Sequence, residues 1–163
     1  MKTLFVALRS VVYASGFLFL WGWLAVTVRR YDPSLGLTLP VWLGVPGIIL
    51  MVFGAAVALA CIASFIARGK GTPAPFDAPR EFVAMGPYRY CRNPMYIGGA
   101  AMLAGYGLYA GSPSVLLLAA GMFALAHTFV ILYEEPTLRK SFGQTYVDYC
   151  RSVRRWLPRL PRG

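Results

Sequence analysis

The chain has 163 residues, of which 58% are hydrophobic and only 13% are charged, and its formal net charge at pH 7 is +10. A soluble domain of this length cannot bury so much apolar surface, so the composition indicates an integral membrane protein. The positive charge raises the question of nucleic-acid binding. The basic residues stand between and after long apolar runs, however, which favours a membrane-surface bias and no nucleic-acid partner.

Four apolar stretches are long enough, or nearly so, to cross a bilayer, which requires about 20 residues. They cover about residues 4–28, 41–67, 94–110 and 114–133. The first exceeds the apolar core of a signal peptide and lacks a small-residue cleavage pattern before Arg29, so we expect it to remain as a membrane helix. The sequence therefore predicts an all-α fold: one membrane domain over residues 1–163, a bundle of about four transmembrane helices, a cytosolic loop at 68–93 and a cytosolic tail at 134–163.

The basic residues predict the orientation of this bundle. The N-terminus, the 68–93 loop and the tail lie on one side of the membrane if there are four spans, and they hold 14 of the 16 lysines and arginines. The positive-inside rule makes that side cytoplasmic, so both termini are expected in the cytoplasm. This arrangement suits a bacterial inner membrane or an equivalent bilayer facing the cytoplasm.

Small residues mark the expected contacts between helices. Gly47 and Gly54 are two turns apart on one face of the second span, and Ala101 and Gly105 form a small-xxx-small pair in the third. Such residues let membrane helices approach closely, and we expect them to pack within one bundle.

The tail has the pattern of an amphipathic helix in the headgroup layer. Phe142, Tyr146, Tyr149 and Val153 recur at intervals of three or four residues, among basic residues. Two interpretations remain open for this helix: a cationic anchor on anionic membrane lipids, or a lid over a site.

The three cysteines and the single histidine argue against a metal centre. Cys61, Cys91 and Cys150 show neither a C-x-x-C pair nor metal-ligand spacing, and His127 is the only imidazole. We therefore predict no metal site.

The hairpin formed by the third and fourth spans carries the most informative pattern. Its turn lies near Pro113, so about 20 residues before it Asn93 and Pro94 face Glu134 and Glu135 across the cytoplasmic boundary. Asn is a good N-cap, Pro a good first helical residue, and the helix start attracts a carboxylate. Two acids at a helix C-terminus are unfavourable, so they require a cationic or hydroxyl-rich ligand, or simply a nearby arginine.

These residues resemble a known family. The stretch Gly-Pro-Tyr-Arg-Tyr-Cys-Arg-Asn-Pro-Met-Tyr at 86–96 precedes the hairpin, and Glu-Glu-Pro-Thr-Leu at 134–138 follows it. Phe142-Gly143, Tyr146, Tyr149 and Val153-x-Arg155-Trp156-x-Pro158 come next. Over residues 80–158 this pattern resembles the isoprenylcysteine carboxyl methyltransferases and their relatives, the phospholipid N-methyltransferases.

The resemblance implies a membrane methyltransferase that uses S-adenosyl-L-methionine and takes a lipophilic acceptor from the lipid. It also implies a set of cofactor-binding residues. The expected lining residues are Tyr88, Asn93, Pro94, Met95, Tyr96 and Glu134. The resemblance also implies Val83, through backbone contacts of the 80–83 segment, and Arg92 and Glu135, which either contact the cofactor or brace the site.

Two positions depart from the family pattern. Asn93 replaces the usual histidine before the proline but keeps a hydrogen-bonding side chain, so cofactor binding is expected to survive. Val130 replaces an arginine that is implied to serve the substrate carboxylate of prenylcysteine enzymes. Another acceptor, such as a lipid amine or a small lipophilic acid or thiol, is therefore at least as consistent with the sequence.

Methyl transfer from a sulfonium to a nucleophile is in line and requires positioning and desolvation of the acceptor. His127 is a candidate general base if the acceptor arrives protonated, because it lies two turns before Glu134, the other catalytic candidate. A lone neutral histidine can equally bond a neighbouring helix. Two other functions remain open: a membrane reductase using a nicotinamide cofactor, and a non-catalytic protein that binds anionic lipid.

Overall fold

A computed structural model describes residues 2–68 and 84–158; the predicted contact at Val83 lies outside the described residues. Every regular element in these two ranges is helical, which confirms the predicted all-α class. The long helices are α1 (Lys2–Val28), α3 (Gly44–Arg68), α4 (Pro94–Tyr109), α5 (Pro113–Phe129) and α6 (Glu135–Ser152). Shorter elements are η1 (Arg29–Tyr31), α2 (Asp32–Leu35), η2 (Val41–Leu43), η3 (Gly86–Arg89) and a π-helical turn, η4 (Val130–Glu134).

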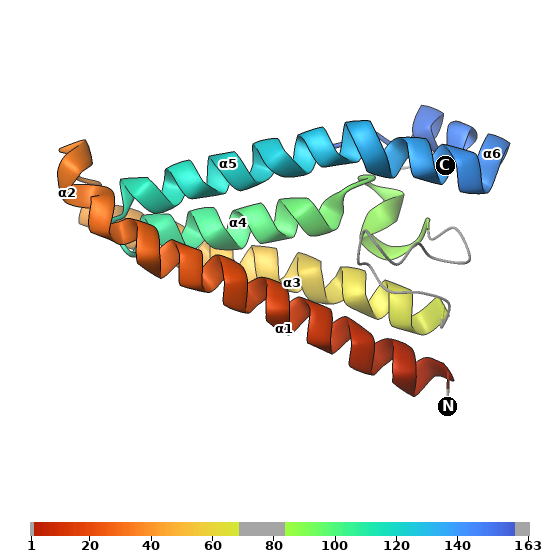
Figure 1. The fold of residues 1–163 in the computed structure, drawn as a ribbon, viewed down its shortest axis with the longest axis horizontal. Helices are drawn as coiled ribbons and strands as arrows, with labels where there is room; N and C mark the ends of the chain where they lie inside the picture. The colour runs from red at the N-terminus through yellow and green to blue at the C-terminus, as the bar shows by residue number, and fades with distance from the viewer. Residues whose placement is uncertain (1, 69–83, 159–163) are drawn as a thin grey trace.

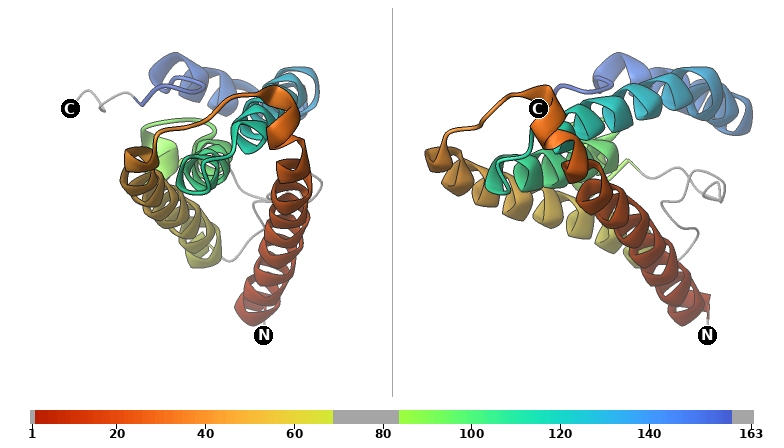
Figure 2. Two further views of the ribbon diagram at one scale, coloured as in Figure 1. Left: turned by 90° about the vertical axis from the view of Figure 1, so that its left-hand side faces the viewer. Right: turned by 60° about the vertical axis from the view of Figure 1, so that its left-hand side comes forward.

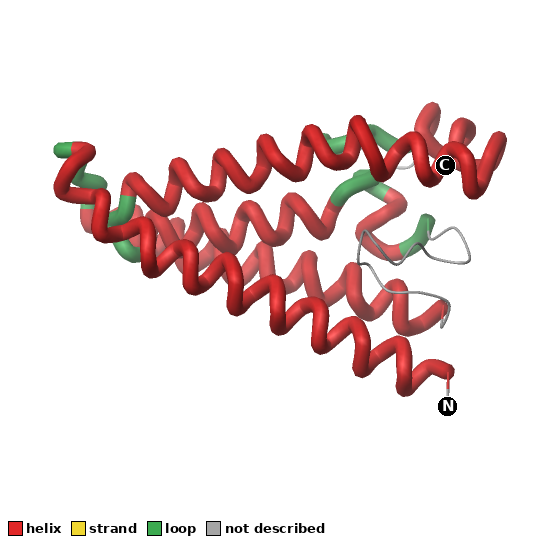
Figure 3. Tube along the Cα trace, in the orientation of Figure 1, coloured by secondary structure: helices red, strands yellow, loops and turns green. Residues whose placement is uncertain are grey.

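The long helices run alternately up and down, so the molecule has two distinct ends (Figure 1). The start of α1, the end of α3, the start of α4 and all of α6 lie together at what we call the α6 end. The opposite α2 end holds α2 and the turn between α4 and α5. Helices α1 and α5 are closest near the α2 end and diverge toward the α6 end (Figure 2). Loops among the described residues gather at these two ends (Figure 3).

Within the part of the chain that the structure describes, three stretches are long and apolar enough to cross a membrane: Val11–Leu35, Val41–Ala67 and Pro113–Ser152. Three candidate spans are thus present, and the predicted fourth rests on α4. This helix has 16 residues, so at about 1.5 Å per residue it extends about 24 Å, less than a hydrocarbon core of about 30 Å. It packs between α3 and α5, where it needs less lipid contact than an isolated span.

Helices α3 and α4 approach closely through two reciprocal glycine pairs. A Cβ on Gly47 would lie 2.6 Å from the Gly105 carbonyl oxygen, and a Cβ on Gly54 would lie 2.5 Å from that of Gly98. The prediction that Gly47 and Gly54 pack within the bundle is confirmed. On α4 the glycines of this contact are Gly98 and Gly105, seven residues apart, so Gly105 of the predicted pair packs against α3.

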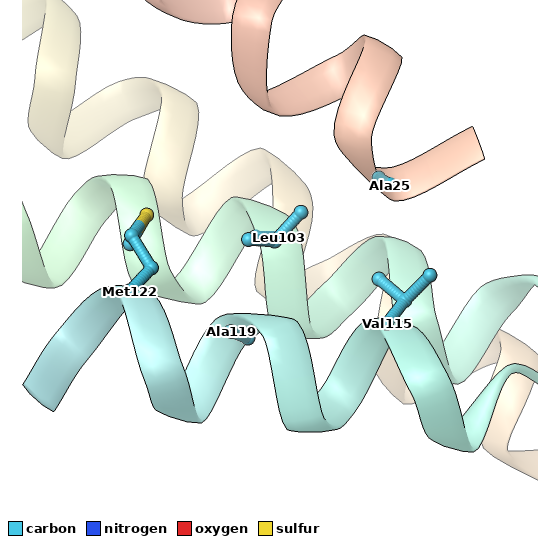
Figure 4. Close-up of a cluster of buried hydrophobic side chains, with 5 residues drawn as sticks. All are labelled: Ala25, Leu103, Val115, Ala119 and Met122. Atoms are coloured by element: carbon cyan, nitrogen blue, oxygen red, sulfur yellow. The ribbon is translucent and has the colours of Figure 1, made fainter. Parts of the chain in front are cut away.

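A small apolar core joins α1 to the α4–α5 hairpin. It consists of Ala25, Leu103, Val115, Ala119 and Met122, all less than 9% exposed (Figure 4). At the α2 end the Asp32 carboxylate accepts hydrogen bonds from the Ser112 hydroxyl and the Ser114 amide, both at 2.9 Å. This carboxylate satisfies a free amide of the first turn of α5, as expected for an acid at a helix N-terminus.

Candidate functional site

The candidate site lies at the α6 end, where η3 packs between the end of α3 and α6. Gly86 has a positive φ of 57° and lies directly against the Ser64 side chain, so a larger residue does not fit there. The Tyr88 ring packs edge-on against Phe65 with 5.5 Å between centroids, and its carbonyl accepts a 2.6 Å bond from the Tyr149 hydroxyl. Burial raises the pKa of the Tyr88 phenol well above its ordinary value, so the phenol stays protonated.

The segment after α6 crosses the beginning of α4; we call residues 153–156 the strap. The Arg92 amide donates to the Arg154 carbonyl at 3.0 Å, which forms a single parallel β-bridge between Cys91 and Arg154. The Cys91 thiol donates to the Arg155 carbonyl at 3.3 Å, and burial raises the pKa of this thiol. The thiol is therefore held protonated as a donor.

Asn93 does not make the capping bond that its position predicts. It stands at the N-cap position of α4, but its side chain makes no capping hydrogen bond. Its amide nitrogen donates instead to the Arg155 carbonyl at 3.1 Å, and the residue is only 5% exposed. Asn93 thus fixes the strap and leaves the free amides at the start of α4 to other partners.

The two consecutive acids have opposite environments. Glu135 is buried and accepts a bidentate pair from Arg155, at 2.7 and 2.9 Å, and an ion pair from Arg92 at 3.2 Å. Arg92 also donates to the Cys150 sulfur, while its Nε has no partner among the described residues. Glu135 is therefore fully neutralised by two guanidinium groups that it holds in place.

Glu134 has no such compensation. Its carboxylate accepts a 2.8 Å hydrogen bond from the Tyr96 hydroxyl, and within residues 2–68 and 84–158 it forms no ion pair. It is half-buried, at the end of η4 and opposite the first turn of α4, in which Pro94 and Met95 precede Tyr96. A carboxylate removed from bulk water without a cation favours a positively charged ligand.

The π-turn explains how the two acids reach different partners. Each residue of an α-helix turns by about 100°, so on a regular helix Glu135 would point about 80° away from His127. A π-turn takes up about one extra residue, which brings Glu135 back to within about 20° of His127, toward the strap. His127 and Glu134 were expected to share a face; instead His127 and Glu135 both contact the strap, and Glu134 contacts α4.

An aromatic cluster joins the strap to α5. The Trp156 indole donates a 2.9 Å hydrogen bond to Nδ1 of His127. Its ring lies 4.7 Å from that of Phe123 and 6.5 Å from that of Tyr96, measured between centroids. Trp156 therefore stands between His127 and the Tyr96–Glu134 pair.

The structure brings most of the predicted site residues together and adds others. Tyr88, Arg92, Asn93, Tyr96, Glu134 and Glu135 all lie at the α6 end, linked by the contacts above. Sequence reasoning missed Arg155 and Trp156 as site residues. Both stand in the quoted motif that ends at Pro158, and an arginine beside a tryptophan just after a predicted helix was the available signal.

The comparisons with known proteins identify the family. The family model described as phospholipid methyltransferase matches residues 42–145, well over half of the chain. The chain belongs to the phospholipid methyltransferase family. The match contains the whole α3–α4–α5 unit and both acids, whereas the strap lies beyond it.

Several curated relatives are similar to part of this phospholipid methyltransferase family member. The nickel-cobalt-cadmium resistance protein NccN of Alcaligenes xylosoxydans xylosoxydans is 34% identical over 80 residues, 49% of this chain and 37% of the relative. The cobalt-zinc-cadmium resistance protein CzcN of Cupriavidus metallidurans is 33% identical over 78 residues, 48% and 36% of the two chains. Phosphatidylethanolamine N-methyltransferase of Paracoccidioides brasiliensis is 34% identical over 86 residues, 51% of this chain and 9% of that enzyme. The chain thus matches little more than a third of the first two and a small part of the third.

Proposed function

We propose that this protein is an S-adenosylmethionine-dependent methyltransferase whose site lies at the α6 end and whose acceptor is lipophilic. One observation carries the proposal. Of two adjacent acids, Glu135 is neutralised by Arg92 and Arg155, while the only described partner of Glu134 is the Tyr96 hydroxyl. A half-buried carboxylate held in this way suits a ligand with a positive charge. S-adenosylmethionine carries two, an ammonium and a sulfonium, so the residues present fit this cofactor.

Each side chain has a distinct part in this proposal. Glu134 and Tyr96 would hold the cationic portion of the cofactor, and the free amides in the first turn of α4, after Asn93 and Pro94, would meet its carboxylate. Tyr88, packed on Phe65, would line the same site. When bound, the cofactor supplies an electrophilic methyl group; the protein's contribution is to position the acceptor and to exclude water.

Among acceptors, we favour the amine of a phospholipid over a prenylcysteine carboxylate. Val130, at the position where an arginine was implied to serve that carboxylate, is fully buried and apolar. The two arginines nearest the site are already engaged by Glu135. A neutral amine needs no arginine, and the relatives named phosphatidylethanolamine N-methyltransferase point to the same class of acceptor.

Calorimetry on the purified protein in detergent tests the cofactor site. S-adenosylhomocysteine, the demethylated product, should bind with micromolar affinity, and Glu134→Gln should weaken binding at least about 10-fold because a charge-assisted contact is lost. Asp148→Asn is the matched control, since it removes the same charge from an exposed position on α6. No binding by folded wild-type protein would refute the proposal and favour a non-catalytic lipid-binding role.

Transfer of a labelled methyl group tests the acceptor. The protein is incubated with S-adenosylmethionine carrying a radioactive methyl group and with either phosphatidylethanolamine or N-acetyl-S-farnesylcysteine. We expect label in the phospholipid only. Label in the farnesylcysteine ester would reassign the acceptor to the carboxylate class.

A further inference from the structure

His127 is an ionisable side chain inside a candidate membrane span, in which such groups usually have a function. Trp156 determines which of the two imidazole nitrogens of His127 carries a proton. An indole nitrogen can only donate, so Nδ1 of His127, which receives the 2.9 Å bond from Trp156, has its lone pair directed at the indole. Neutral His127 therefore carries its proton on Nε2.

This tautomer changes the role open to His127. A general base needs a free lone pair, but the lone pair of neutral His127 is occupied by Trp156. The Nε2–H group is the free one, because among the described residues the only hydrogen bond of His127 is the one from Trp156. The carboxylates among the described residues all have other partners. Asp32 accepts from Ser112 and Ser114, and Glu134 accepts from Tyr96. Glu135 binds Arg92 and Arg155, and Asp148 binds Gln144 and Arg151. His127 is thus a hydrogen-bond donor that lacks an acceptor.

The position of His127 along α5 indicates which acceptor it would meet. It lies seven residues before Glu134, about 10 Å deeper along the helix axis. In an amine phospholipid that enters from the cytoplasmic leaflet, the phosphodiester lies between the amine and the acyl chains. With the amine directed to the Glu134 level, the phosphodiester is displaced toward His127. A prenylcysteine carboxylate, by contrast, is itself the reacting group and would lie at the Glu134 level.

We propose that His127, held as the Nε2–H tautomer by Trp156, donates a hydrogen bond to the phosphodiester of an amine phospholipid acceptor. The inference rests on the proposed function and adds to it a residue that recognises the headgroup. His127 is then a binding residue for the acceptor, and Trp156 is a positioning residue that acts through it. The Phe123 ring, tilted by 56° against that of Trp156, supports the indole from the α5 side.

The chain offers a direct measurement because His127 is its only histidine. Protein labelled with ¹⁵N-histidine gives one imidazole spin system, whose two-bond proton–nitrogen correlations distinguish the tautomers. In a maltoside detergent, which has no phosphate, we expect the Nε2–H form. Dihexanoyl phosphatidylethanolamine should shift the Nε2 and Hε2 resonances, and dihexanoylglycerol, with the same chains and no phosphate, should not.

Matched variants separate the positioning role of Trp156 from the binding role of His127. Trp156→Phe keeps a ring but removes the N–H, so it should abolish the tautomer preference and weaken the phospholipid response. Thr128→Val, on the exposed face of α5, should leave the tautomer preference and the response to phospholipid unchanged.

Activity assays test the binding role of His127. His127→Asn keeps an oxygen where Nδ1 accepts and loses the Nε2 donor, so it should raise the KM for phospholipid about 10-fold. The affinity for S-adenosylhomocysteine should not change. His127→Gln, whose amide reaches the Nε2 position, should restore much of this loss.

Three results would overturn the inference. They are an Nδ1–H tautomer in the free protein, a response to dihexanoylglycerol equal to that to the phospholipid, and a response to N-acetyl-S-farnesylcysteine instead of the phospholipid. None of these depends on cofactor binding. Failure of the proposed function is read separately, as the absence of S-adenosylhomocysteine binding by calorimetry.

Discussion

At the scale of single residues, the molecule assigns adjacent acids to different tasks. Glu135 makes three charge-assisted contacts with Arg155 and Arg92, and its side chain is 11% exposed. Within the described residues, Glu134 accepts one hydrogen bond, from the uncharged Tyr96 hydroxyl. The first arrangement stabilises the fold at the α6 end, whereas the second leaves a charge available to a ligand. Stability and binding should therefore separate when the two are replaced individually.

Glu135→Ala is expected to destabilise the protein by about 3 kcal/mol, because it leaves the buried Arg92 charge without its acid. The melting temperature in detergent should fall by roughly 5–10 °C. Asp148→Ala removes an acid from an exposed pair with Arg151 and should cost less than about 1 kcal/mol. Equal shifts for the two variants would show that the Arg92–Glu135–Arg155 contacts do not brace the fold.

Glu134→Gln is expected to leave the stability of the free protein nearly unchanged and to weaken ligand binding. The amide can still accept from Tyr96, so the melting temperature of the free protein should change by less than about 2 °C. Loss of stabilisation by added S-adenosylhomocysteine is the expected signature, measured as the ligand-induced rise in melting temperature. A large drop in stability without ligand would mean that Glu134 serves the fold instead of the site.

At the scale of elements, the α3–α4 contact depends on glycines that have no room for a side chain. Gly54→Ala would place a Cβ 2.5 Å from the Gly98 carbonyl oxygen and 2.8 Å from the Met102 amide nitrogen, both backbone atoms. We expect a cost of about 1–3 kcal/mol from the resulting helix displacement, seen as a lower melting temperature. Gly22→Ala in α1, where nothing lies within 4 Å, is the control and should be neutral or stabilising.

The π-turn at Val130–Glu134 gives a second prediction at this scale. Deleting the exposed Leu132 should convert η4 to regular α-helix and remove the one extra residue that the π-turn takes up. Glu135 then lies seven residues after His127, still within about 20° of it, so everything after η4 should keep its orientation. Helical content measured by circular dichroism should persist, Glu135 should still reach Arg155, and cofactor binding should be retained. Lost binding in a folded variant would show that the extra residue of the π-turn does not orient the acids in this way.

The sequence predicts the elements better than their mutual contacts. The all-helical class, the turn near Pro113 and the Gly47–Gly54 interval follow from composition and helical period, and the structure confirms them. Of the four predicted spans, three candidates are present among the described residues. The π-turn cannot be read from Val-Ile-Leu-Tyr-Glu, because its residues suit an α-helix equally well. Asn93 donates to the strap 62 residues away, a contact that local rules of helix capping do not contain. The hairpin pattern thus predicts the candidate site, while the bracing of that site depends on long-range contacts.

At the scale of the whole molecule, charge differs sharply between the two ends. Among the described residues, Arg29 and Arg30 lie near the α2 end, with Asp32 beside them. The α6 end carries a larger set of cations: Arg89, Arg92, Arg139, Lys140, Arg151, Arg154 and Arg155. From the positive-inside rule we predict that the candidate site faces the cytoplasm.

Cysteine accessibility tests this orientation. In a Cys150→Ser background, in which Cys61 and Cys91 remain buried, single cysteines are placed at exposed positions: Leu37→Cys near the α2 end and Lys140→Cys on α6. In sealed cells or right-side-out vesicles, a membrane-impermeant maleimide should label position 37 at once and position 140 only after permeabilisation. Denatured samples control for intrinsic reactivity. The opposite pattern would place Glu134 on the far side of the membrane, away from the cytoplasmic pool of the cofactor, and the methyltransferase assignment would then require an external source of it.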